Sequence, residues 1–563
     1  LSIGNNTTGS YNTGIGYSSL AANTTADNNT ALGYGTLAVN TTGIENVAVG
    51  ADALDANTTG NYNTAVGGNA LTAATTGDSS TGIGYNALAA QTTGQYNTAV
   101  GSAALASVTT ADNNTAVGRN ALLVVTTGNE TVAVGASAGL SQTTGGENVL
   151  VGFKAGQSIT TAGNNTLIGW KTAENNATQA YLTAVGHSAL QANTSGQRGT
   201  AVGAFCLDAN TTGNFNVAVG YAALSGNTTG PQNTGVGYEA LLAQTTATGN
   251  TGIGFRAGHD ITTGGNNIAI GSEAYALGTT ATYNLAIGNN TLDAITGGSY
   301  NIAIGNISMG KQNTTTGNVF NTAVGHFSLS ESTTGNDNTC MGYASLLDLT
   351  TATGNTAFGN YSGENITTGY SNALFGRDSG SVLTTGYGNS MLGYGTNASA
   401  NNGEFQIVLG NGVTGHGDNK LTFGQGTGDN RVYNSYTVNA SWTRVSDERY
   451  KENIKPNTDC GLAFINDLNP ITFTWKAKAD IDSSLPDYDE TQLKPKYDRK
   501  LYGLIAQEVK EAIDKHGIED FGGWDVEENT GIQSVSQEMF IHPLIKAVQE
   551  LSAEVEELKK KLN

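Results

Sequence analysis

The feature that most constrains this chain is a 17-residue repeat. A glycine preceded by an apolar residue recurs every 17 positions from Gly16 to Gly305, and after a three-residue insertion within residues 311–320 the series resumes from Gly325 to Gly410. These 24 copies follow the template N-T-A-V-G-x-x-A-L-x-x-x-T-T-G-x-x. The alternating Thr-Ala-Val segment predicts a short strand that ends in a turn at the glycine, and Thr-Thr-Gly predicts a second corner.

We expect the copies to stack on one another. One copy is too short to bury a core of its own, whereas parallel copies in register place valine on valine at the strand spacing of about 4.8 Å. Frequent glycine, threonine and asparagine oppose a long helix, and a disordered segment has no reason to keep an apolar residue in phase through 24 copies. Residues 1–410 are therefore predicted to form a mostly β rod, a parallel β-roll or β-solenoid of about 24 coils and about 115 Å.

Aromatic residues recur at two positions of the repeat, and the sequence leaves two interpretations open. The rings could stack on sugars of a surface polysaccharide, or they could pack between chains or along the edge of the roll; we favour packing. His187 and His326 share the first position and are interpreted as members of the same row. The first position, directly after the glycine, holds Tyr17, Tyr34, Tyr85, Phe153, Trp170, Tyr221, Tyr238, Phe255, Tyr343 and Tyr394, and the second, five residues before it, holds Tyr11, Tyr62, Tyr96, Phe215, Tyr283 and Tyr300.

Charge is distributed unevenly along the chain. The formal net charge is −21, and 31 of residues 1–440 are charged, against 40 of residues 441–563. No basic stripe is present, so we expect no nucleic-acid partner, and no run of 18 apolar residues is present, so we expect no membrane insertion. The chain begins at Leu1 without methionine or an apolar leader, and we expect the natural N-terminus to lie upstream.

The three cysteines are expected to be free and buried. Cys206, Cys340 and Cys460 lack the spacing of metal ligands and cannot all pair within one chain. Cys206 and Cys340 stand where the template has alanine, so packing explains them. We therefore expect no metal and no cofactor.

Composition changes after the repeat and predicts three further regions. Residues 411–445 are interpreted as a short β collar, residues 446–540 as a small α+β domain, and residues 541–563 as a coiled coil. Within the small domain, residues 461–469 are predicted to be helical and residues 501–516 to form a strand followed by a helix.

The end of the chain carries an unbroken heptad seam. Apolar residues alternate at spacings of three and four, which places them at the a and d positions of a coiled coil. β-Branched residues at a with leucine at d favour a dimer in isolated coiled coils. Because this helix is short, we give that preference less weight than the rest of the chain and predict a trimer. The seam consists of Ile541, Leu544, Val548, Leu551, Val555, Leu558 and Leu562.

The octapeptide SDERYKEN at residues 446–453 holds a candidate catalytic pair, Ser446 and Lys451. A serine hydroxyl becomes a nucleophile when a base removes its proton, and a lysine amine can be that base when burial or its neighbours depress its pKa. Serine near lysine is common, and Ser446 could equally be the N-cap of a helix. The spacing alone therefore does not assign catalysis.

The C-terminal region resembles a known family. SDERYKENI at 446–454, Leu-Asn-Pro at 468–470 with Phe473 and Trp475, YGLIAQEV at 502–509 and the terminal coiled coil are similar to the endosialidase-type intramolecular chaperone domain of phage tail spikes and fibres. The repeat resembles the head repeats of trimeric autotransporter adhesins and repeats of phage tail fibres, although those adhesin heads have a shorter period.

The resemblance implies a mechanism for this region. In that family the domain trimerises, templates the folding of the preceding β-structure and then cuts itself off. Carried over, Ser446 is the nucleophile, Lys451 its general base, and the scissile bond adjoins Ser446, between Ser446 and Asp447. Tyr450 stands where the family often has leucine, which leaves both catalytic positions intact.

The predicted function is a homotrimeric, extracellular fibre that attaches to a host or cell surface, as a tail fibre of a virion. Its partners would be two further copies of itself and a surface receptor or polysaccharide. Its only enzymatic activity would be a single-turnover serine autoproteolysis, with none on external substrates. The alternatives are a bacterial surface adhesin without cleavage and a polysaccharide-degrading tail spike, which would need two carboxylates converging in a groove.

Overall fold

The computed structural model describes residues 2–315, 317–426, 430–436, 443–444, 448–486, 488–495, 500–527 and 530–562. The chain divides into two compact units, residues 1–445 and residues 446–563. Each unit is described on its own below.

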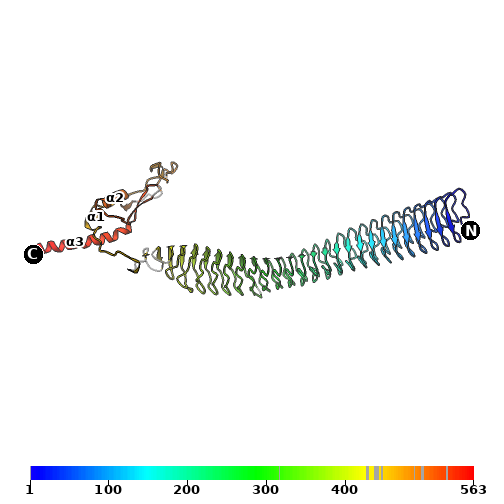
Figure 1. Ribbon diagram of the computed structural model, residues 1–563, viewed down its shortest axis with the longest axis horizontal. Helices are drawn as coiled ribbons and strands as arrows, with labels where there is room; N and C mark the ends of the chain where they lie inside the picture. The colour runs from blue at the N-terminus through cyan, green and yellow to red at the C-terminus, as the bar shows by residue number, and fades with distance from the viewer. Residues whose placement is uncertain are drawn as a thin grey trace. The chain divides into compact units, whose positions relative to one another are not determined.

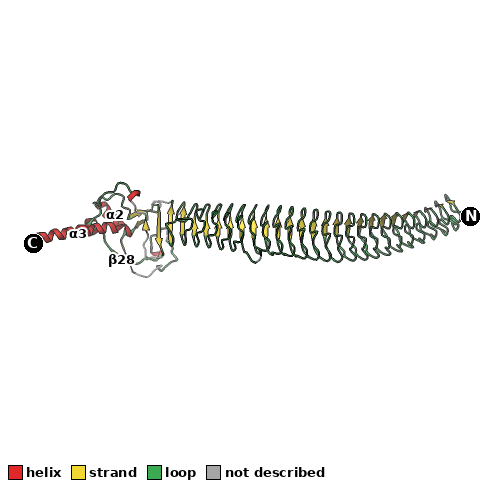
Figure 2. Ribbon diagram, turned by 90° about the horizontal axis from the view of Figure 1, so that it is seen from below, coloured by secondary structure: helices red, strands yellow, loops and turns green. Residues whose placement is uncertain are grey.

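The first unit contains the predicted parallel β-solenoid (Figures 1 and 2). Each strand pairs in parallel with the strand of the next coil, at an offset of 17 residues except between β18 and β19, as Thr98 to Val100 do with Thr115 to Val117. All these pairings lie within one chain. The strands are β1 (Thr13–Ile15), β2 (Thr30–Leu32), β3 (Val47–Val49), β4 (Thr64–Val66), β5 (Thr81–Ile83), β6 (Thr98–Val100), β7 (Thr115–Val117), β8 (Val132–Val134), β9 (Val149–Val151), β10 (Thr166–Ile168), β11 (Thr183–Val185), β12 (Thr200–Val202), β13 (Val217–Val219), β14 (Thr234–Val236), β15 (Thr251–Ile253), β16 (Ile268–Ile270), β17 (Leu285–Ile287), β18 (Ile302–Ile304), β19 (Thr322–Val324), β20 (Thr339–Met341), β21 (Thr356–Phe358), β22 (Ala373–Phe375), β23 (Ser390–Leu392) and β24 (Ile407–Asn411).

The template explains how one coil closes around its core. In β4 the middle residue, Ala65, is buried, while its neighbours face outward because successive strand residues point to opposite faces. Gly67 follows at φ 136°, and a Cβ there would lie 2.6 Å from the carbonyl oxygen of Gly84 in the next coil, so glycine is required. Leu71 completes the core in a left-handed conformation at φ 53°. That conformation costs about 1–2 kcal/mol, and burial of the leucine offsets it by about 1.5–3 kcal/mol.

A row of buried asparagines runs through the solenoid. Asparagine occupies the position four residues before the glycine in 19 of the 24 copies. The Asn114 side chain donates to the carbonyl oxygen of Gly128 (2.8 Å) and accepts from the backbone N–H of Thr131 (3.0 Å), and the backbone N–H of Asn114 donates to the Asn97 side chain (3.0 Å). Each asparagine therefore satisfies backbone groups that the coil would otherwise bury without partners.

Replacing Asn114 with leucine tests this row. The substitution keeps the volume but leaves the Gly128 carbonyl and the Thr131 N–H without their partners. We therefore expect the free energy of local unfolding to fall by about 2–5 kcal/mol. Hydrogen exchange should report it as faster exchange at the Thr131 amide, by at least about tenfold. Thr127→Leu, at an exposed position of the same coil, is the matched control. Unchanged protection at Thr131 in the Asn114 variant would contradict the role given to the asparagine.

The Thr-Thr-Gly corner is also fixed by hydrogen bonds between coils. The hydroxyl of the first threonine donates to the carbonyl oxygen of its equivalent in the next coil, as Thr58 does to Thr75 (3.0 Å) and Thr211 to Thr228 (3.0 Å). The hydroxyl is therefore used within the rod, and the second threonine, such as Thr127, is the one that faces solvent.

Many of the aromatic residues stack along the rod within one chain. The ring centroids of Tyr221 and Tyr238 lie 5.3 Å apart and those of Tyr238 and Phe255 lie 5.4 Å apart, with nearly parallel planes. His187 stacks on Trp170 at 4.5 Å, which confirms that it belongs to the row. In these runs rings of neighbouring coils stack on one another within one chain, and Tyr221, Tyr238 and Phe255 remain 45–48% exposed.

The insertion and the end of the repeat change the coil length without breaking the sheet. β18 pairs with β19 at an offset of 20 residues, so the three extra residues enlarge one coil. After β24 the stack continues for one further, 14-residue step, to β25 (Lys420–Gln425). β26 (Arg431–Ser435) and β27 (Thr443–Arg444) then pair antiparallel. The sequence predicted a short β collar over residues 411–445 but did not indicate this shortened coil.

The second unit is a small α+β domain with a long terminal helix (Figure 1). Its core gathers around Phe464, which is fully buried, with Val509, Ala512 and Ile513. The predicted helix, strand and second helix are all present. The elements are η1 (Glu448–Tyr450), α1 (Leu462–Asn466), β28 (Ile471–Phe473), η2 (Lys478–Asp480), β29 (Leu501–Gly503), α2 (Ala506–Lys515), β30 (Trp524–Val526), β31 (Gln533–Val535), η3 (Gln537–Phe540) and α3 (Ile541–Leu562), with β28 antiparallel to β29 and β30 to β31.

The cysteines are free and buried, as predicted. Burial raises the pKa of Cys206 to about 11 and that of Cys340 to about 12. Both thiols therefore stay protonated at neutral pH and serve as small core residues.

Candidate functional site

The predicted catalytic pair lies at the junction of the two units. Ser446 and Asp447, the predicted nucleophile and cleavage site, fall outside the described residues. The short helix η1 (Glu448–Tyr450) follows them. Lys451 comes directly after this helix, and its backbone N–H donates to the carbonyl oxygen of Glu448 (3.0 Å). The geometry of the Ser446–Lys451 pair therefore remains a prediction.

The surroundings of Lys451 bear on its proposed chemistry. Its side chain is exposed, and so are residues 452–459 that follow it. A lysine that acts as a general base needs burial or neighbouring charges to depress its pKa. In the single chain, burial does not provide that environment.

The predicted heptad seam lies along one side of α3 and is uncovered in the single chain. All seven seam residues, from Ile541 to Leu562, are between 41% and 86% exposed. The same helix buries Pro543 and Ala547 against the domain. α3 therefore uses one side to pack on its own domain and presents an apolar stripe on another.

Glu550 joins α3 to the start of α1. Its carboxylate accepts from the backbone N–H of Leu462 (2.7 Å), which is one of the N–H groups that a helix start leaves without a partner inside the helix, and it also pairs with Lys546 (3.4 Å). The hydrogen bond from Leu462 holds the pKa of Glu550 below its usual value. Sequence reasoning missed this contact, because a glutamate outside the a and d positions of a coiled coil normally faces solvent and carries no other signal.

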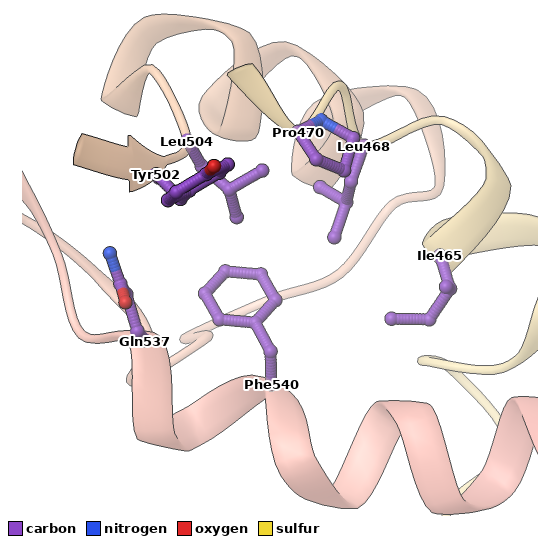
Figure 3. Close-up of a pocket in the computed structure, with 8 residues that line it drawn as sticks. Ile465, Leu468, Pro470, Tyr502, Leu504, Gln537 and Phe540 are labelled. Carbon is purple, nitrogen blue, oxygen red and sulfur yellow. The ribbon is translucent and has the colours of Figure 1, made fainter. Parts of the chain in front are cut away.

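A pocket of about 340 Å³ opens beside the start of α3 (Figure 3). The ring of Phe540 points into it from η3, opposite Leu468, Tyr502 and Leu504, and Gln537 stands at its side. The lining is almost entirely apolar, and Tyr502 is 74% exposed. The pocket offers no set of polar groups converging on a point, which an active site for an external substrate would need.

Two kinds of site were sought in the described part of the chain, a metal-ligand cluster and a membrane-spanning helix. There, no three His, Cys, Asp or Glu side chains gather closely enough to hold a metal ion. Among the same residues, no helix combines the length and the hydropathy needed to cross a membrane.

The elements from η1 to α2 carry the SDERYKEN, Leu-Asn-Pro and YGLIAQEV motifs. Residues 446–518 match the family model described as chaperone of endosialidase. The endosialidase-chaperone match begins at the predicted nucleophile and ends just beyond α2. Together with the β-solenoid, it fits a tail fibre or tail spike with a C-terminal chaperone domain, and confirms the resemblance drawn from the motifs. In the same comparisons, no curated protein and no solved structure matched the chain.

Proposed function

We propose that this chain is the subunit of a homotrimeric, extracellular fibre that attaches a virion to its host. The endosialidase-chaperone region aligns three copies and then cleaves itself off at Ser446. The observation that carries the proposal is the family match at residues 446–518, together with the terminal helix α3, whose apolar seam has no cover in the single chain. The rod would be the permanent part of the fibre and the C-terminal unit its temporary assembly device.

The driving force for assembly would come from the seam. Each copy contributes seven apolar side chains that are roughly half exposed, and burying them at about 1 kcal/mol each gives roughly 7 kcal/mol per helix before ordering costs. Three parallel helices would bury all three seams in one coiled coil.

The need for an aligning device follows from the repeat. Strands pair at a fixed 17-residue offset within one chain, so covalent linkage sets the order of coils in each rod. Between copies, however, a shift by one whole coil preserves nearly every side-chain match, since successive coils are nearly identical. A C-terminal trimer would fix the alignment before the rods associate.

Cleavage would use the junction residues in defined roles. Lys451, as the neutral amine, takes the proton of the Ser446 hydroxyl as the hydroxyl oxygen attacks the carbonyl carbon of the Ser446–Asp447 bond of a neighbouring copy, because attack on its own carbonyl would close a four-membered ring. The Asp447 amine leaves with the proton that Lys451 returns, and water hydrolyses the ester that joins the two copies. Because Lys451 is exposed in the single chain, assembly would supply the burial that depresses its pKa and would thereby make cleavage depend on trimerisation.

Intact mass under native and denaturing conditions tests the proposal. We expect a native assembly of three chains, and denatured chains shortened by residues 447–563, about one fifth of the 563 residues. Sequencing the new end of the released fragment should place the cut between Ser446 and Asp447. A full-length trimer would support an adhesin-like fibre without cleavage, and a monomer at micromolar concentration would overturn the proposed assembly.

A further inference from the structure

One face of the solenoid differs from the rest of its surface. We define the strand face as the first and third residues of the repeat strands β1 to β24, which point outward on either side of the buried middle residue. The third residue is apolar in all 24 strands, and the first is threonine, serine or an apolar residue. None of these 48 positions is charged, while the 27 charged residues among residues 1–410 all lie elsewhere.

The strand face is exposed in the single chain. Ile83, Ile168 and Phe375 at the third position are 37–40% exposed, and Val132 and Ile268 at the first position are 38% and 39% exposed. The middle residues of the same strands are buried in the coil. The in-register parallel pairing places equivalent side chains next to one another from coil to coil, which makes the face continuous.

The size of this face is that of an interface between proteins. Twenty-four strands at about 4.8 Å give about 115 Å in length, and the first and third residues span about 7 Å, so the face covers roughly 800 Å². The largest apolar patch on a typical monomer is about 300–600 Å², and a stable interface takes about 800 Å² from each partner. Depletion of charge is also typical of interface cores.

Its period points to a single kind of occupant. A partner that covers the whole face must be equally long, apolar and uncharged, and must repeat at the strand spacing. Another copy of this chain meets all four conditions. The stacked rings of Tyr221, Tyr238 and Phe255 lie outside the strand positions and are not part of this face. The stacked pair of Phe358 and Phe375 belongs to it.

We propose that the strand faces of neighbouring copies pack against one another and form the apolar interior of the assembled rod. The inference rests on the proposed assembly of several copies and adds which surface they share. It leaves the stacked rings of Tyr221, Tyr238 and Phe255, the charged residues and the outer threonines of the Thr-Thr-Gly corners on the outside of the assembly.

Cysteine cross-linking locates the shared surface. Val117→Cys places a thiol at the third position of β7, and Thr127→Cys places one on an exposed corner of the same coil as a matched control. The native thiols are buried, so the unsubstituted chain under the same mild oxidant gives the background. We expect covalent copies on a denaturing gel from Val117→Cys, at least about five times the yield from Thr127→Cys, with a peptide that joins residue 117 to residue 117.

The outcomes separate this inference from the proposed function. A trimeric native mass with cross-links at residue 127 but not at residue 117 would overturn the strand face as the interface while leaving the trimer intact. A monomeric native mass would overturn both. A second variant of the full chain, Val117→Lys together with Val134→Lys, should lower the trimer fraction relative to Thr127→Lys, whereas an unchanged fraction would contradict the inference.

Discussion

Replacing Ser446 with alanine should yield a chain that remains full length on a denaturing gel, while the native assembly stays trimeric. The variant removes the hydroxyl proposed as the nucleophile and leaves every described contact of the C-terminal unit unchanged, so cleavage should stop and assembly should continue. The unsubstituted chain should be shortened by residues 447–563, about one fifth of its length. The uncleaved fraction should rise from a minor part of the protein in the unsubstituted chain to essentially all of the protein in the Ser446→Ala variant.

Lys451 gives the matching test of the base. Lys451→Ala should block cleavage to the same extent as Ser446→Ala, because the two residues act in one step and their losses are not additive. Lys455→Ala, four residues further along the same exposed segment, is the control and should cleave normally. If the Ser446→Ala chain is still shortened, the nucleophile is another group. If only the Lys451→Ala chain is shortened, the general base is another group.

The second large effect is expected from the seam of α3. Val548→Asp combined with Leu551→Asp places two carboxylates where the apolar stripe would be buried. Burying such charges without partners costs several kcal/mol, so the association of copies should weaken by more than about 100-fold. Sedimentation or native mass spectrometry at micromolar concentration should then find monomers in place of trimers.

The same variant tests whether cleavage depends on assembly. Ala553→Asp adds one charge on a side of α3 away from the seam and should neither dissociate the trimer nor stop cleavage. A seam variant that is monomeric but still cleaved would contradict the dependence proposed for Lys451. A seam variant that remains trimeric would place the main association surface elsewhere, in the rod.

The rod could be predicted almost completely from the sequence, because the same pattern of residues recurs in 24 copies. What the pattern did not indicate is which apolar residues form the core. The most invariant apolar position, such as Val66, faces outward, whereas the smaller Ala65 beside it is buried, since adjacent strand residues point to opposite faces and the narrow coil admits a small side chain. The stacking of Tyr221, Tyr238 and Phe255 was readable in principle, because residues 17 apart meet in adjacent coils.

The candidate site was predictable only in part. The heptad seam and the motifs around residue 446 are local patterns, and the family match supports the second of these. The contact between Glu550 and the Leu462 N–H joins residues 88 apart, and nothing in the composition of either segment connects them. The spatial relation of Ser446 to Lys451 is likewise a matter of tertiary geometry, which the spacing of five residues does not fix.

The enlarged coil between β18 and β19 has a consequence for how such rods change length. Three extra residues are accommodated in one coil, and the next strand still meets its neighbour in phase, as Ile304 does with Val324. The length of the rod therefore depends on the number of coils, and the number of residues in a single coil can vary. Its length changes in steps of about 4.8 Å. A tandem duplication or loss of one 17-codon unit would therefore lengthen or shorten the rod by one step without requiring a new core, a new junction or a new terminal helix.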